Sequence, residues 1–243
     1  MLKKLYDKSK IWFAVAWIIA YCVAMSLGDG ISASLGLEKS VSLAVGLLLS
    51  ALLVAFLKKH GLMKAYGLCR SQTPARAVGF YIPIALMLTA NLWHGVTCNY
   101  GAVETVLYML TMLCVGFLEE VIFRGLLFNA MRGESLVSAV IVSSLTFGIG
   151  HIINLVNGSG AELIPNLLQV IYATAAGFMF VMLYLKTDSL LVCIAAHGLF
   201  NAISVFAAQP TLTGQIISCA ALTAITDGYG VYLALREKKQ QAE

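Results

Sequence analysis

The sequence predicts an all-α, polytopic membrane protein with about eight transmembrane helices. Of its 243 residues, 60% are hydrophobic and only 12% are charged, and the mean hydropathy is +0.86. A soluble domain carries about 25% charged residues, so this chain lacks the polar surface that water requires. Apolar runs recur along the whole chain between short polar breaks, and we therefore expect a single integral membrane domain over residues 1–243.

The first predicted element is an uncleaved transmembrane helix. A basic segment, Met1–Lys10, precedes the apolar run Ile11–Leu27. A signal peptide is the competing interpretation, but its apolar region usually has about 7–15 residues, and this run is longer. Further hydrophobic segments also follow it, which favours a membrane anchor that remains in the chain.

Seven further apolar runs follow the first helix. Each is long enough, or nearly so, to cross a hydrocarbon core of about 30 Å. They are Val41–Leu57, Ala77–Leu92, Val103–Met131, Leu136–Ile153, Leu163–Leu185, Leu190–Phe206 and Leu212–Leu235. We expect Val103–Met131 to form one unusually long α-helix of about 43 Å, because its second half has no helix breaker apart from Gly125.

Basic residues predict how these helices are oriented. They gather in alternate loops, and Lys39 is the one exception in the other loops. This positive-inside pattern puts both termini in the cytoplasm and requires an even number of spans. The basic residues are Lys3, Lys4, Lys8 and Lys10 before the first span, Lys58, Lys59, Lys64, Arg70 and Arg76 after the second, Arg132 after the fourth, Lys186 after the sixth, and Arg236, Lys238 and Lys239 after the eighth.

The polar segment Lys58–Arg76 is too hydrophilic to span the membrane. We expect it at the cytoplasmic interface, either as a short amphipathic helix or as a solvated loop. Nothing in it indicates a nucleic-acid partner, and the lipid bilayer is the partner that the composition requires. Short loops and small size favour the plasma membrane of a bacterium over the endoplasmic reticulum.

The stretch Gly116–Gly125 carries charges within an apolar span. It contains Glu119, Glu120 and Arg124. Charged side chains are very unfavourable against lipid, so these three should face a bundle interior or a wet cavity. Glu120 and Arg124 are four residues apart and can form an ion pair on one helix face. Glu119 lies about 100° away around the axis, which leaves its carboxylate for chemistry.

Three more polar residues fall at compatible depths in other spans. His151 lies about 22 Å along the fifth span from its cytoplasmic end, and Asn201 about 16 Å along the seventh. Glu119 lies about 18–20 Å from the cytoplasmic end of the fourth span, and His197 is shallower by about one turn. A lone histidine in a membrane helix is often only an interhelical hydrogen-bond partner. The whole set at matching depths instead favours a functional site.

These residues resemble a known family. Glu119-Glu-Val-Ile-Phe-Arg124 fits the pattern Glu-Glu-x-x-x-Arg, Phe147-x-x-x-His151 fits a second motif, and His197-x-x-x-Asn201 a third. In this order and inside membrane spans, the motifs are similar to those of the CPBP family of CAAX proteases and bacteriocin-processing enzymes, also called Abi, which includes the type II CAAX prenyl endopeptidases. The resemblance covers the core at residues 103–206.

The resemblance implies an intramembrane endopeptidase. Glu119 would be the general base, and His151 would help it hold and activate a water molecule. Glu120 and Arg124 would be a supporting pair, while His197 and Asn201 would stabilise the oxyanion. These residue types suit peptide hydrolysis, which needs a base for water and donors aimed at the developing negative charge.

A metal-dependent version of the same site stays open. Zinc would be held by Glu119, His151 and His197, with a bound water made more acidic by the metal. The sequence has no His-Glu-x-x-His motif, and we favour a glutamate-activated water without an obligatory metal. The implied substrate is a membrane-associated peptide or lipidated protein, prenylated or bacteriocin-like, that reaches the site from the cytoplasm or laterally from lipid.

Two other functions are compatible with the sequence. Intramembrane Glu, His and Arg also build proton relays, so a proton-coupled transporter is the main alternative, although no inverted repeat is visible. A non-catalytic bacteriocin-immunity or scaffold protein is the third. Substitution of Glu119 by glutamine separates a scaffold from a hydrolase, because a scaffold should tolerate the change and a hydrolase should lose its activity.

Overall fold

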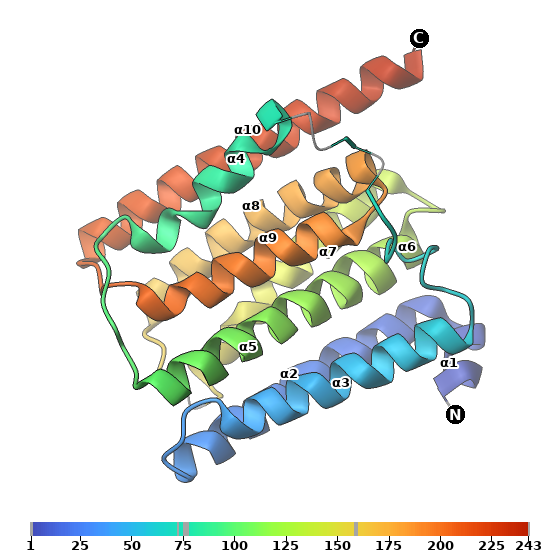
Figure 1. Ribbon diagram of the computed structural model, residues 1–243. Coiled ribbons are helices and arrows are strands. Elements are labelled where there is room, and N and C mark those ends of the chain that lie inside the picture. The colour runs from blue at the N-terminus through green and yellow to red at the C-terminus, as the bar shows by residue number, and fades with distance from the viewer. Residues whose placement is uncertain (1, 72, 75–77, 158–159, 243) are drawn as a thin grey trace.

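Helices make up nearly all the regular structure in the computed structural model, which describes residues 2–71, 73–74, 78–157 and 160–242. Within this part of the chain, the only strand-like pairing is an isolated bridge between Val96 and Ala207. The helices are α1 (Leu2–Lys8), α2 (Lys10–Ser34), α3 (Ser40–Lys59), α4 (Val78–Leu88), η1 (Ala90–Leu92), α5 (Ala102–Glu119), η2 (Glu120–Phe128), α6 (Asn129–Met131), α7 (Leu136–Gly150), η3 (His151–Leu155), α8 (Leu163–Thr187), α9 (Leu190–Ile203), η4 (Ser204–Phe206) and α10 (Leu212–Ala242). They form one bundle of roughly parallel and antiparallel rods (Figure 1).

The predicted membrane-protein architecture is confirmed. In the described residues, six helical segments are long and apolar enough to cross a membrane, and two shorter apolar segments, Tyr81–Leu92 and Leu190–Phe206, correspond to the third and seventh predicted spans. Many large apolar side chains on the long helices are exposed, as lipid-facing positions require; Ile19, Leu48 and Ile171 are examples. The predicted start of the third span at Ala77, with the neighbouring Arg76, lies outside the described residues.

Both ends of the chain lie at the same end of the bundle (Figure 1). The loop between α3 and α4 and the turns that follow α6 and α8 lie there as well, and these segments carry the basic residues. Lys39 is between α2 and α3, at the opposite end. The fold thus gathers the positive charge at one end, which the positive-inside rule assigns to the cytoplasm.

The fourth predicted span is helical to Met131, but it is not one uniform α-helix. After α5 the chain continues as a π-helix, η2, and all nine of its residues are buried. The expectation of a regular α-helix was therefore wrong in this segment. Because α2, α7, α8 and α9 surround η2, tertiary packing decides its winding, and π-turns of this kind occur often at functional sites.

Glycines allow the site-bearing helices to approach closely. A Cβ atom on Gly116 of α5 would lie 2.6 Å from the backbone nitrogen and Cα of Gly198 in α9. A Cβ on Gly148 of α7 would lie 2.0 Å from Oγ1 of Thr174 in α8. Small residues at helix contacts are how membrane helices bring their backbones together. Here they bring α5 close to α9, both of which carry motif residues, and α7 close to α8.

The polar loop after α3 packs under the cytoplasmic end of the bundle. Its described residues form turns and no helix, so the amphipathic-helix alternative was wrong. Tyr66 is buried, the backbone carbonyl of Gly67 accepts a 2.8 Å hydrogen bond from the Leu190 amide, and Ser189 donates to the Cys69 carbonyl at 2.6 Å. The loop thus closes the start of α9.

Candidate active site

The fold brings the predicted site residues together from three separate parts of the chain. Glu119 is the last residue of α5, Glu120 and Arg124 are in η2, and His197 and Asn201 lie one turn apart in α9. The sixth residue, His151, begins the 3-10 segment η3 at the end of α7. The contacts described below join all six directly or through shared cavity walls, so the residues placed at similar depths by the sequence lie in one region of the bundle.

Glu120 and Arg124 form a fully buried ion pair. Arg124 Nη1 donates to Glu120 Oε1 at 3.0 Å, and neither side chain is exposed. The guanidinium carbon lies 4.1 Å from the centre of the Phe147 ring and 5.5 Å from that of Phe180, so two aromatic rings also contact the cation. Gly177 leaves the space, because a Cβ there would lie 3.2 Å from Arg124 Nη2. This pair ties η2 to α7 and α8.

His197 lies between the two neighbouring carboxylates. Its Nδ1 is 2.8 Å from Glu120 Oε1, and its Nε2 is 3.5 Å from Glu119 Oε2. Because a carboxylate that already pairs with arginine acts as an acceptor, Nδ1 carries the proton in this hydrogen bond. The imidazole stacks on Phe180 with the rings 5.4 Å apart, which fixes its plane. His197 therefore connects α9 to both glutamates.

Glu119 is held by a residue that the motifs do not contain. The hydroxyl of Tyr21 in α2 donates to Glu119 Oε1 at 2.7 Å. The Glu119 side chain keeps 12% of its surface exposed, whereas that of Glu120 is fully buried. The sequence reasoning missed Tyr21; the only signal was a hydroxyl group midway along a strongly apolar first helix.

His151 has a defined ring orientation. Its Nδ1 is 3.1 Å from the backbone carbonyl of Phe147, which can only accept, so Nδ1 carries the proton and Nε2 has the lone pair in the neutral ring. The amide of Asn166 in α8 donates to the His151 carbonyl at 2.9 Å. One hydrogen bond thus holds the His151 ring and another holds its backbone. Nε2 is the ring nitrogen that is available to accept a proton or a hydrogen bond.

Two cavities meet at His151 and Phe147. The first, of about 120 Å³, contains Glu119 and Tyr21. The second, of about 50 Å³, contains His197 and Asn201 and is otherwise mostly apolar. Both are large enough to hold at least one water molecule beside polar groups. His151 is therefore positioned between the carboxylate of Glu119 on one side and the amide of Asn201 on the other.

The described side chains are not gathered into a three-ligand metal site. Among the described residues, no group of three or more His, Cys, Asp or Glu side chains is placed to hold a metal ion. Both oxygens of Glu119 face protein partners, Tyr21 and His197. The two histidines use their Nδ1 atoms in hydrogen bonds to the Phe147 carbonyl and to Glu120, which leaves their Nε2 atoms as the nitrogens that could bind a ligand. A zinc ion bound by Glu119, His151 and His197 would require these side chains to reorient.

Comparison with known proteins supports the family resemblance. Residues 101–203 match the family model for type II CAAX prenyl endopeptidase, Rce1-like. The matched segment begins in the loop before α5, ends with α9, and contains all six predicted site residues. No curated protein and no solved structure matched the chain. The resemblance inferred from the three motifs is thus confirmed, and at the family level it is to a CAAX-type endopeptidase embedded in a membrane.

Proposed function

We propose that this multi-pass membrane protein, with its Rce1-like segment, is an intramembrane endopeptidase whose nucleophile is a water molecule activated by Glu119. The observation that carries the proposal is that Glu119 and His151 line the same cavity. They do so beside a buried Glu120–Arg124 pair. A carboxylate and an unprotonated imidazole nitrogen are two acceptors for the two hydrogens of one water molecule.

In the proposed reaction, Glu119 takes a proton from the water as its oxygen forms a bond to the carbonyl carbon of the substrate peptide. His151 Nε2 accepts a hydrogen bond from the second O–H group of the water, which turns an oxygen lone pair toward the carbonyl carbon. The carbonyl oxygen becomes an oxyanion. The C–N bond then breaks, and the amine nitrogen leaves with the proton that Glu119 collected. General-base assistance of this kind contributes about 10²- to 10⁴-fold.

Asn201 is the better placed of the two residues proposed to stabilise the oxyanion. Its side chain lines the cavity that contains His151, and an amide N–H is a suitable donor to developing negative charge. Both ring nitrogens of His197 face carboxylates instead. We propose instead that His197 supports Glu119. When Glu119 has taken the water proton, its Oε2 can donate a hydrogen bond to Nε2 of His197.

The family that residues 101–203 match implies substrates that are prenylated or otherwise lipidated proteins. For this chain we propose a membrane-associated peptide, and a lipid group is compatible with the mostly apolar second cavity, whose walls include Met87, Ala173 and Phe180. The bacteriocin-related functions of the wider family are a second possibility for the same site.

The test is cleavage of a quenched lipidated-peptide library by the purified protein in detergent. Glu119→Gln and His151→Ala should each lower cleavage by at least about 100-fold while the helical content stays unchanged. Glu134→Gln and His60→Ala, which remove a carboxylate and an imidazole far from the cavities, are matched controls and should cleave like wild type. Activity that survives Glu119→Gln would refute the assignment of the base, and substrate flux without a cleaved product would favour a transporter.

A further inference from the structure

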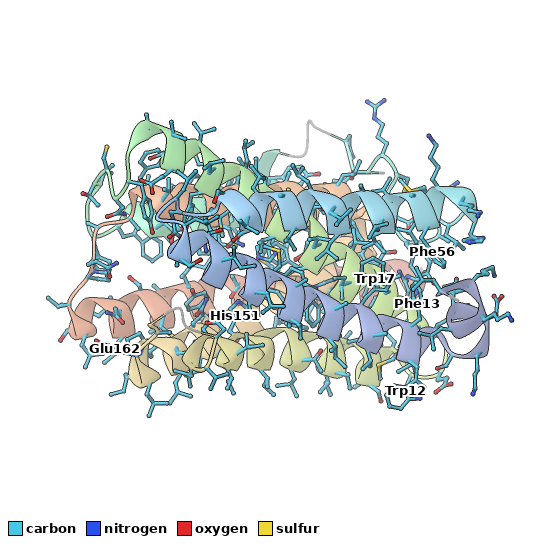
Figure 2. All side chains as sticks on the ribbon, turned by 90° about the horizontal axis from the view of Figure 1, so that it is seen from below. Trp12, Phe13, Trp17, Phe56, His151 and Glu162 are labelled. Carbon is cyan, nitrogen blue, oxygen red and sulfur yellow. The ribbon has the colours of Figure 1, made fainter. Side chains whose placement is uncertain are left out.

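The cavities that contain the site extend toward one end of the bundle only. The Glu119 cavity continues along α2 to Asp29, near the end of that helix, and along η3 to Asn157 in the following loop. Asp29 is about 12 Å along α2 from Tyr21. All of this lies toward the end opposite the chain termini: in Figure 2 Glu162 is near one end and Trp12, Phe13 and Phe56 are toward the other, with His151 between them on the Glu162 side.

The second cavity leads to the same end. It shares Tyr172 and Phe200 with a third cavity of about 460 Å³. The walls of this third cavity reach loop residues beyond the helix ends, among them His94, Glu162 and Pro210. On each side of His151, a cavity or a pair of cavities with shared walls therefore extends from the site residues toward the loops opposite the termini.

The path toward the termini is filled by packed side chains. Every residue of η2 is buried. Beyond η2, aromatic rings contact one another: Tyr6 lies 5.3 Å from Phe13, and its hydroxyl is 2.8 Å from that of Tyr66. The rings of Phe128 and Tyr184 are 6.2 Å apart. Among the described residues at this end, close packing of this kind leaves no passage for a peptide.

The charges along the open routes are acidic. No lysine or arginine lines any of these three cavities, while Glu119, Asp29 and Glu162 do. Asp29 pairs with Lys39 at 2.9 Å. Burial lowers the pKa of Lys39, but the Asp29 and Glu38 carboxylates raise it more, so this lysine stays protonated and balances Asp29. The walls thus suit a neutral or basic stretch of polypeptide and offer no cation for a terminal carboxylate.

We propose that the site is reached from the extracytoplasmic side, and that its substrate is a neutral or basic peptide segment of an exported polypeptide held at the outer leaflet. The packed end carries the basic residues and is cytoplasmic by the positive-inside rule, so the open end faces outward. This inference rests on the proposed peptidase function and specifies the side from which the scissile bond arrives. It differs from the sequence-based expectation, in which the peptide enters from the cytoplasm or laterally from lipid.

Two native cysteines mark the two sides. Cys98 is exposed in the loop before α5, and Cys69 is in the loop after α3. Two variants each retain only one of these cysteines. With a membrane-impermeant maleimide, the variant that retains Cys98 should be labelled in right-side-out vesicles, and the variant that retains Cys69 should be labelled in inverted vesicles. The opposite labelling pattern would overturn the proposed orientation.

Cleavage is then measured in the same two vesicle preparations with a membrane-impermeant cationic peptide that the detergent-solubilised enzyme cleaves. We expect cleavage to be at least tenfold faster in right-side-out vesicles, and inverted vesicles should cleave the peptide only after detergent is added. Cleavage measured with the Glu119→Gln variant in each preparation gives the background from host proteases, which is subtracted. Faster cleavage in inverted vesicles would refute outward access while leaving the peptidase intact. Failure of wild type in detergent would instead refute the proposed function.

A pair of variants on α2 tests the route itself. Ser26 lines the Glu119 cavity, whereas Val23 faces outward with 52% of its surface exposed. Ser26→Trp should block the cavity and lower kcat/KM for the impermeant peptide at least tenfold, and Val23→Trp should leave it unchanged. Equal activity of the two variants would exclude this route.

Discussion

The backbones of Gly116 and Gly198 meet where α5 crosses α9, so close that a Cβ on the first glycine would lie 2.6 Å from the second. Glu119 and Glu120 follow Gly116 by one turn, and His197 immediately precedes Gly198. The separation of these helices therefore sets the 2.8 Å contact between His197 and Glu120.

Gly116→Ala should weaken both folding and activity. The added methyl group meets backbone rather than a flexible side chain, and overpacking of this kind costs about 1–3 kcal/mol. We expect a lower melting temperature in detergent and at least tenfold lower kcat. Gly30→Ala is the matched control, because a Cβ at Gly30 meets no atom within 4 Å; it should melt at or above the wild-type temperature. Equal behaviour of the two variants would contradict the close crossing.

The Glu120–Arg124 pair should show strong coupling in a double-mutant cycle. Removal of one partner leaves an uncompensated buried charge, which costs about 3–5 kcal/mol. Glu120→Gln and Arg124→Met should therefore each lower the melting temperature sharply, and the double variant should be less destabilised than the two losses combined. Melting followed by circular dichroism measures this, and additive losses would show that the pair contributes no net interaction.

Tyr21→Phe should lower kcat with little change in KM. It removes the donor to Glu119 Oε1, and a hydrogen bond to a charged group contributes about 1.5–3 kcal/mol, which corresponds to about 10- to 100-fold in rate. Tyr6→Phe is the control, since it breaks the hydroxyl contact to Tyr66 at the packed end. If both variants lower kcat equally, Tyr21 acts through the fold and not through Glu119.

Metal removal should leave cleavage intact. The described histidines and carboxylates are not arranged as a three-ligand site, and the proposed water is activated by Glu119. Protein dialysed against a chelator should therefore retain wild-type kcat/KM, and added zinc should not raise it. A loss of activity that zinc restores would show that Glu119, His151 and His197 rearrange to bind the metal.

The sequence predicted the membrane spans and the residues that meet because both depend on patterns along single helices. Hydropathy located the spans, and the depth of each polar residue indicated that Glu119, His151 and Asn201 share a level. The spacing of Glu120 and Arg124 predicted an ion pair that the structure contains. The catalytic roles of these residues remain predictions.

Features that depend on contacts between helices were not predictable in this way. Tyr21 and Glu119 are 98 positions apart in the chain, and no local pattern relates them. The π-helix is similar, because a segment buried on every side has no exposed face to reveal its period. The side from which the site opens depends on where η2 and the aromatic rings pack, which again is a property of the assembled bundle.

The Glu120–Arg124 contact also bears on how the chain enters the membrane during synthesis. Both partners belong to one helical segment, four residues apart, so they can neutralise each other before the helices that follow this segment have been made. The translocating segment then carries one uncompensated carboxylate, that of Glu119, instead of three separate charges, and a central charge alone opposes insertion by about 2.5–3.5 kcal/mol. The residues that build the site thus also ease its delivery into the bilayer.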